Sequence, residues 1–317
     1  MSAYFTLINA VAPVFATIAI GFLARRARWL TAEADASLLR LTVNILYPCL
    51  VLDSVLGNRA LEKIDTLLLA PAVGFGTVLA GYAVSFFTAK ILRLGQERQQ
   101  RTFAFATGIY NYGYIPIPLI VSIFAGGGAT IGVLLIHNLG VEICLWTAGV
   151  MVITGASLRE GWRKILNPPV IAILVALALN LFGGKDWIPS FALTAAHLTG
   201  ASAIPLGLIL TGASFADLMR GARIGDGWKI IGVSCVLRLL VLPLFFVLLA
   251  RWLPCSIELK RVIVVQAAMP SAVIPIVLAK HYGGDPSVAL QVVLGTTILS
   301  LLTIPLWIRA GLAFAGI

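Results

Sequence analysis

Long apolar runs separated by short polar links make up most of the chain. Each run is close to the ~20 residues that an α-helix needs to cross the hydrocarbon core of a bilayer. The pattern predicts an all-α polytopic membrane protein with ten membrane-spanning helices. The predicted segments, numbered in chain order, cover residues 4–24, 37–57, 66–92, 102–124, 129–154, 167–183, 191–216, 229–251, 259–280 and 287–310.

Segments 4 and 9 each contain a pair of prolines that interrupts the helical pattern. Proline has no backbone N–H, so the carbonyl four residues earlier loses its helical partner. A broken helix persists at membrane depth only where protein or a water-filled cavity covers its free backbone groups. We therefore expect two broken helices that cross each other, at residues 108–119 and 266–275. Their prolines are Pro116, Pro118, Pro270 and Pro275.

The two halves of the chain repeat the same layout of prolines. Pro205 in segment 7 follows Pro48 in segment 2 at nearly the same distance along the chain as Pro275 in segment 9 follows Pro116 in segment 4. This predicts two equivalent units of five segments. Because five is odd, the second unit enters the membrane in the opposite orientation, as in the inverted repeats of secondary transporters. The predicted parts are the first repeat, 1–158, a cytoplasmic linker, 159–166, and the second repeat, 167–317.

The composition agrees with a membrane protein. Of the 317 residues, 60% are hydrophobic and 11% are charged, and the mean hydropathy is +0.99, which excludes an ordinary soluble domain. The net charge of +10 does not indicate nucleic acid as a partner, because Lys and Arg lie in short links between apolar runs. Such clusters are typical of positive-inside topology. Lys and Arg are more numerous in the links after odd-numbered segments, which are therefore predicted to be cytoplasmic, with both termini outside. The expected location is a bacterial-type inner (plasma) membrane.

Several function classes have no support in the sequence. The four cysteines, Cys49, Cys144, Cys235 and Cys255, lie singly, without metal-ligand spacing, and are expected to be buried hydrophobes. The chain has no Walker A, H-E-x-x-H or G-x-S-x-G motif. We therefore expect no enzyme, no ATP-driven pump, no metal site and no cofactor.

The broken helices supply candidate chemistry. The N-terminus of each second half-helix carries free N–H groups and roughly +0.5 charge, which suits a carboxylate. Asn111 can donate its amide, Ser271 its hydroxyl, and the neighbouring tyrosines a phenol or an aromatic wall. The alternatives are a simple kink at the prolines, interhelical packing for Asn111 and a helix cap for Ser271. The candidate binding residues are Asn111, Tyr112, Gly113, Tyr114, Pro116, Met269, Pro270, Ser271 and Pro275.

Three ionisable residues fall within the predicted segments: Asp53, Glu142 and Arg238. Charges at such depth mark substrate pathways, proton sites or buried partners. Glu142 can carry a proton or neutralise Arg238. It lies about one helical turn from His137, which is a further candidate for coupling or an ion pair. Asp53 is expected near the outer surface as a solvated carboxylate. For Arg238 we expect a buried partner or a role in steering an anionic substrate.

Three short motifs carry a family resemblance. They are Asn-Tyr-Gly-Tyr-Ile-Pro at 111–116, Ala-Met-Pro-Ser-Ala-Val-Ile-Pro at 268–275 and Ala-Lys-His-Tyr-Gly at 279–283. With them and its ten-segment layout, the chain resembles the auxin efflux carrier family, which includes plant PIN-formed auxin exporters and bacterial malate and malonate carriers. The resemblance implies a scaffold, a transport part that moves like an elevator, an anionic substrate at the crossing of the broken helices, and a homodimer.

The chain departs from that family at two places. Tyr112 and Tyr114 flank Gly113 where many bacterial members carry a second Asn and Gly, and Ile274 stands where a polar residue, commonly Asn, is expected. A binding site with two asparagines is therefore not carried over to this sequence.

Two functions remain open at this point. The first is a secondary active or facilitative transporter of small organic anions, such as malate or malonate, which works either as a uniporter or with proton coupling through Glu142 or Asp53. Sodium coupling and an auxin-like aromatic substrate are variants of it. The second is a membrane receptor or scaffold that binds an organic anion at the crossing without moving it. The expected partners are the anion, the lipid bilayer and a second copy of the chain.

Overall fold

The computed structural model describes residues 2–124, 127–155, 165–221 and 227–317. Every regular element in these ranges is helical, as predicted. Seven helices in the described ranges are long and apolar enough to cross a membrane. They are Leu7–Arg26, Glu33–Val55, Ile64–Ile91, Gly128–Thr154, Ser190–Asp217, Trp228–Trp252 and Pro286–Ala315.

Three of these long helices contain a π-helical turn, which the sequence pattern did not predict. π turns inside α-helices occur frequently at functional sites. Their positions are α2 (Ala32–Leu41), η1 (Thr42–Leu46) and α3 (Tyr47–Val55); α7 (Gly128–Cys144), η3 (Leu145–Gly149) and α8 (Val150–Thr154); and α12 (Trp228–Val236), η7 (Leu237–Val241) and α13 (Leu242–Trp252).

The other elements are continuous helices, interrupted helices and short connections. The continuous helices are α1 (Ser2–Arg26), α4 (Ile64–Ile91), α9 (Pro168–Leu181) and α16 (Pro286–Ala315), and α10 (Ser190–Ala201) leads into α11 (Ala203–Gly221). The interrupted pairs are α5 (Glu97–Gly108) with α6 (Pro116–Ile123), and α14 (Ile257–Ala267) with α15 (Ile274–His281). Two 3₁₀ turns, η2 (Arg59–Leu61) and η6 (Gly184–Trp187), lie in connections.

Two of the predicted segments begin several residues later than the helices that contain them. The helix of segment 2 begins at Ala32 and not at 37, and that of segment 4 begins at Glu97 and not at 102. Polar caps extend both helices, because Thr31 accepts a bond from the backbone of α2 and Gln96 forms a capping box at the start of α5. Hydropathy detects only the apolar part of such helices. Most of the predicted linker 159–166 lies outside the described residues.

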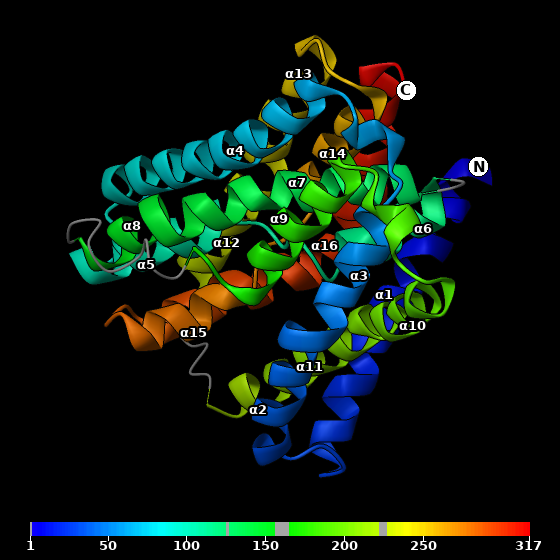
Figure 1. Cartoon of the computed structure of the whole chain (residues 1–317). Helices are drawn as coiled ribbons and strands as arrows, with labels where there is room; N and C mark the ends of the chain where they lie inside the picture. Colours follow the sequence, from blue (N-terminus) through cyan, green and yellow to red (C-terminus); the bar gives the residue numbers. More distant parts are fainter. Residues whose placement is uncertain (1, 125–126, 156–164, 222–226) are drawn as a thin grey trace.

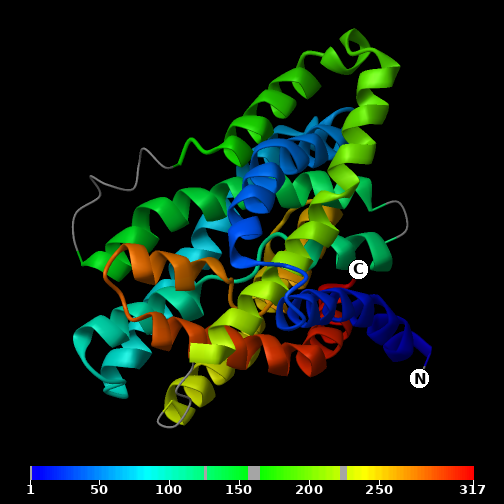
Figure 2. The same cartoon turned by 90° about the horizontal axis from the view of Figure 1, so that it is seen from below.

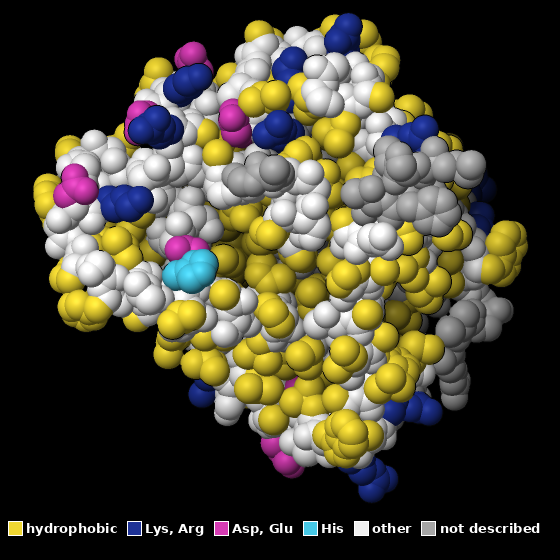
Figure 3. Space-filling model, turned by 90° about the vertical axis from the view of Figure 1, so that its right-hand side faces the viewer, with side chains coloured by type: hydrophobic (Ala, Val, Ile, Leu, Met, Phe, Trp, Pro, Cys, Tyr) yellow, Lys and Arg dark blue, Asp and Glu magenta, His cyan; other side chains and the backbone are white. Residues whose placement is uncertain are grey.

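The helices pack into two neighbouring groups. Figure 1 shows α4, α5, α7, α15 and α16 running side by side, with α1, α3, α10 and α11 gathered next to them. Figure 2 shows the same grouping from below, and in both views the N- and C-terminal ends lie on the same side. In Figure 3, hydrophobic side chains cover the middle of the face, while most Lys, Arg, Asp and Glu lie toward its edge. These features fit a multi-pass membrane protein.

Glycines allow α4 and α7 to approach closely. A Cβ atom at Gly74 would overlap the backbone carbonyl oxygen of His137, and one at Gly140 would overlap that of Pro71. Small residues at helix interfaces permit such contacts between membrane helices. The close packing holds α7, with its polar side chains, against α4.

Gly74→Ala is therefore expected to destabilise the protein by about 1–3 kcal/mol, because its methyl group would force the two helices apart. Gly76 on the same helix has open space around it and provides the control, since Gly76→Ala removes a helix-interior glycine without a clash. Thermal unfolding in detergent would compare the two variants. Equal melting temperatures would show that the approach of α4 to α7 is not tight.

Candidate functional site at the crossing of two unwound segments

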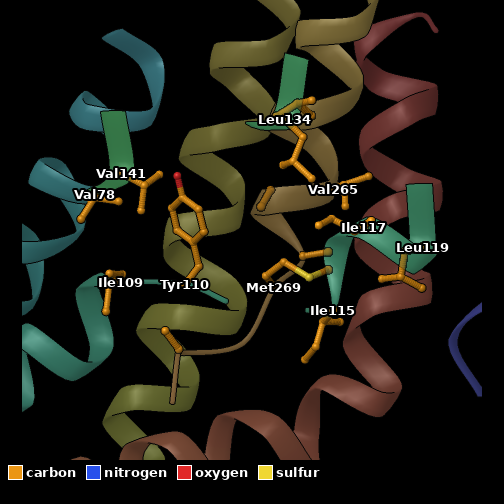
Figure 4. Packing of buried hydrophobic residues seen from close by; sticks show 14 of the residues in the cluster. Val78, Ile109, Tyr110, Ile115, Ile117, Leu119, Leu134, Val141, Val265 and Met269 are labelled. Atoms are coloured by element: carbon orange, nitrogen blue, oxygen red, sulfur yellow. The ribbon is translucent and has the colours of Figure 1, made fainter. Parts of the chain in front are cut away.

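Two unwound segments, residues 109–115 and 268–273, separate the halves of the interrupted helices. Together they are called the crossover below. Figure 4 shows Ile109, Tyr110 and Met269 of these segments surrounded by hydrophobic side chains from several helices. The sequence predicted both interruptions from their prolines, and the helices end and restart within the predicted ranges.

Backbone hydrogen bonds join the two segments directly. The N–H of Asn111 donates to the carbonyl of Pro270 at 2.7 Å, and the N–H of Ala272 donates to the carbonyl of Ile109 at 3.1 Å. The pair forms a single antiparallel bridge. Each segment therefore satisfies backbone groups of the other, which unwound chain at membrane depth requires.

Side-chain amides satisfy a carbonyl that Pro116 leaves without a helical partner. The carbonyl of Tyr112 accepts from Asn138 Nδ2 at 2.7 Å and from Gln266 Nε2 at 3.4 Å. Gln266 Nε2 also lies 3.3 Å from Asn138 Oδ1. Both amides are buried. They connect α7, α14 and the first unwound segment, so the break is a built feature and not a simple kink.

Asn111 and Ser271 present polar groups that the described protein does not use. Asn111 is buried and its Oδ1 accepts from the N–H of Ile115 at 3.3 Å, while its NH₂ has no acceptor among the described residues. The Oγ of Ser271 is buried and has no hydrogen-bond partner within the described ranges. The backbone N–H of Ser271 donates to Thr296 Oγ1 at 3.2 Å. An amide and a hydroxyl are thus available at the crossover.

The three tyrosines of the first segment have different surroundings. The hydroxyl of Tyr110, which is fully buried, lies 2.9 Å from Thr77 Oγ1 and 3.4 Å from His137 Nε2. Tyr112 donates its hydroxyl to Glu142. The ring of Tyr114 fills the space in front of Gly207 on α11. Tyr110 and Tyr112 therefore support the site, and Tyr114 is its contact with α11.

Three neutral groups hold Glu142. Its Oε1 accepts from Tyr112 Oη at 2.7 Å, and its Oε2 accepts from Trp146 Nε1 at 2.9 Å and Asn167 Nδ2 at 3.2 Å. Trp146 lies in the π turn η3, and Asn167 caps the start of α9. Glu142 forms no ion pair with Arg238 among the described residues, so the predicted neutralisation is absent and each group has partners of its own.

Arg238, in the π turn η7, lies fully buried beneath the second segment. Its Nε donates to the carbonyl of Met269 at 3.1 Å and its Nη2 to that of Ala267 at 3.5 Å. The guanidinium carbon lies 5.2 Å from the ring centre of Tyr110 and 5.3 Å from that of Phe246. The predicted buried partners are thus carbonyls and aromatic rings.

These contacts compensate much of the cost of burying the arginine. Removing a cation from water costs several kcal/mol even after the protein relaxes. A hydrogen bond to a charged group returns about 1.5–3 kcal/mol, and a desolvated cation–π contact about 2 kcal/mol. Its Nη1 is buried without an acceptor in the described part of the chain. Because arginine is not deprotonated in proteins, Arg238 places a positive charge at the crossover.

The other two predicted coupling residues lie in different places. His137 lies against Tyr110 and Asn138, with its Nδ1 3.4 Å from Asn138 Oδ1, and no bond from it to Glu142 occurs among the described residues. Asp53 is partly exposed on α3, with its Oδ2 3.0 Å from His197 Nδ1.

A cavity of about 490 Å³ lies between α11 and α15. It extends from Val273, in the unwound segment at the start of α15, to Lys280 and His281 at the end of that helix. Its lining also includes Ser214, Asp217, Ile276 and Val277. The Oδ2 of Asp217 lies 3.4 Å from Arg25 Nε. The crossover is thus bordered by a space large enough for a small organic molecule.

A family described as membrane transport protein matches residues 6–160 and 157–308 of the chain. The chain belongs to this family of membrane transport proteins, that of the auxin efflux carriers. The predicted family is confirmed, and the protein is a membrane transporter.

The relatives of this family member span archaea and plants. An uncharacterized transporter of Methanothermobacter thermautotrophicus is 27% identical over 305 residues, which cover 94% of this chain and 96% of the relative. A second uncharacterized transporter, from Methanocaldococcus jannaschii, is 24% identical over 301 residues, which cover 93% of this chain and 95% of the relative. Auxin efflux carrier component 8 of Arabidopsis thaliana is 26% identical over 134 residues, which are 41% of this chain and 36% of the plant protein.

Several residues of the site were not among the predicted ones. They are polar residues inside apolar segments, and that feature is the signal that identifies them in the sequence. They are Thr77, Asn138, Trp146, Gln266 and Thr296, with Asn167 at the start of α9.

Glu142→Gln is expected to leave the stability of this transporter nearly unchanged, because Gln keeps one oxygen for Trp146 and Asn167 and the Tyr112 hydroxyl can accept from its NH₂. Glu142→Leu would remove the acceptor of three hydrogen bonds from partly buried donors and is expected to lower the stability by about 1–3 kcal/mol. Thermal unfolding in detergent would compare the melting temperatures of the two variants with that of the wild type. A Leu variant as stable as the Gln variant would contradict the hydrogen-bond assignment.

Proposed function

We propose that this protein is a secondary active or facilitative transporter of small organic anions, mono- or dicarboxylates such as malate or malonate. The observation that carries the proposal is the fully buried Arg238, which has no carboxylate partner among the described residues. A buried cation whose partners are neutral carbonyls and aromatic rings favours an anionic ligand nearby. A substrate carboxylate would supply the missing negative charge.

The polar groups at the crossover suit the same ligand. Asn111 offers an NH₂ and Ser271 a hydroxyl, and both groups lack protein partners in the described ranges. The half-helices α6 and α15 start at the crossover, so their N-termini add partial positive charge there. Met269, Pro270, Pro275, Gly113 and Pro116 would shape the site through the backbone, and Tyr112 and Tyr114 through their rings.

We further propose ten membrane crossings in two inverted repeats, 1–158 and 167–317. The seven long spans would be joined by the two interrupted helices and by the short apolar α9 (Pro168–Leu181). The distribution of Lys and Arg supports cytoplasmic links after odd segments and both termini outside, in a bacterial-type plasma membrane.

The proposed transport step is an elevator movement of the crossover past a scaffold. Scaffold helices α1, α3, α9, α10 and α11 would stay in place, together with a second copy of the chain in a homodimer. Two contacts would have to change during the movement, those of Tyr114 with Gly207 and of Glu142 with Asn167. The cavity between α11 and α15 would give the substrate access from one side of the membrane.

The deciding experiment measures uptake of labelled malonate, malate, succinate, lactate and indole-3-acetate into proteoliposomes. We expect saturable flux of at least one acid. Parallel runs with and without proton and sodium gradients test coupling. Specific binding without flux, under conditions in which a control carrier works, would favour the receptor and refute the transporter. Equal flux of neutral analogues would refute the anion site.

Substitutions at the crossover test the site itself. Asn111→Asp keeps the oxygen that accepts from Ile115 but replaces the NH₂ with negative charge, so uptake should be abolished. Ser271→Ala should reduce uptake by up to about tenfold, the value of one hydrogen bond. Ser122→Ala is the matched control, because Ser122 lies exposed on α6 and bonds only within that helix. Equal uptake by all three variants would place the site elsewhere.

A further inference from the structure

The C-terminal end of α14 presents free carbonyls to Arg238. In a continuous helix the carbonyl of Ala267 would accept from the N–H of Ser271, but that N–H donates to Thr296. The carbonyl of Met269 lies in the unwound segment. Both carbonyls accept from the guanidinium instead. The C-terminus of a helix also carries roughly −0.5 charge, so this position is electronegative before Arg238 is added.

Carbonyls of this kind bind cations in other broken helices. Unwound backbone and half-helix C-termini commonly coordinate the coupling ion of secondary transporters. In this chain the arginine side chain already occupies them. No cluster of three or more His, Cys, Asp or Glu side chains that could hold a metal occurs in the part of the chain that the structure describes.

We propose that the guanidinium of Arg238 is a built-in cation of the crossover, occupying a carbonyl site that a monovalent cation from solution would otherwise fill. The rings of Tyr110 and Phe246 complete this site around a planar cation. Arg238 is thus a positioning residue. It keeps the carbonyls of Ala267 and Met269 in place, and through them the second unwound segment.

The test is chemical rescue of Arg238→Ala. The purified variant is expected to unfold at a temperature roughly 5 °C or more below wild type. Guanidinium at about 10 mM, far below denaturing concentrations, should fill the vacated space and raise the melting temperature. Sodium should raise it less, because the aromatic rings favour the planar ion. Choline chloride keeps the ionic strength constant throughout. Wild type should respond to neither ion.

A pair of further variants separates charge from volume. Arg238→Lys keeps a cation near the carbonyls, whereas Arg238→Met keeps an unbranched side chain without charge. We expect the Lys variant to unfold roughly 5 °C above the Met variant. This comparison also decides the question if Arg238→Ala cannot be purified. Arg251→Met provides the control, because Arg251 is exposed at the end of α13 on the same long helix.

Two results would overturn the inference. One is equal melting temperatures of the Lys and Met variants, which would show that charge has no role at this position. The other is a purified Arg238→Ala variant that responds to neither guanidinium nor sodium. These measurements do not involve transport, so they separate this inference from the proposed function. A protein that transports nothing can still show the expected melting temperatures, and an active carrier can still lack them.

Discussion

The pairing of the two unwound segments is the interaction on which the rest of the structure depends. Free N–H and C=O groups in the middle of a membrane must find partners within the protein. Two backbone hydrogen bonds, from Asn111 to Pro270 and from Ala272 to Ile109, provide part of that pairing. They also fix the second helix halves, α6 and α15, relative to each other. The polar residues of α7 and α14 follow from the same requirement, since Asn138 and Gln266 cover the carbonyl of Tyr112.

Charge is distributed unevenly around this pairing. Glu142 is held by neutral donors on the side of α9, whereas Arg238 lies between carbonyls and aromatic rings beneath the second segment. A direct ion pair would cancel both charges and leave an apolar crossing. Keeping them apart leaves a carboxylate beside Tyr112 and a cation beside Met269.

Local chemistry explains which features the sequence predicted. Proline removes a helical hydrogen bond, and the paired prolines of segments 4 and 9 predicted the two breaks. Single prolines do not break a helix here, since Pro13, Pro71 and Pro305 lie within the continuous helices α1, α4 and α16. The partners of the freed carbonyls depend on tertiary contacts, which is why Gln266 was not predicted. The sequence left two roles open for Glu142, carrying a proton or neutralising Arg238, because opposite charge alone does not identify a partner; in the structure its partners are neutral donors. The π turns have no local signal in the sequence.

One of those π turns has a consequence for the geometry of the long helix that contains it. Residues eight apart on a regular α-helix are rotated by about 80° relative to each other. A π turn accommodates one additional residue, which reduces that rotation to about 20° in the opposite sense. Arg238 lies in η7 and Phe246 eight positions later in α13. The extra residue thus brings the guanidinium and the ring onto one face, and the alignment of a cation with its aromatic neighbour depends on the register of a single turn.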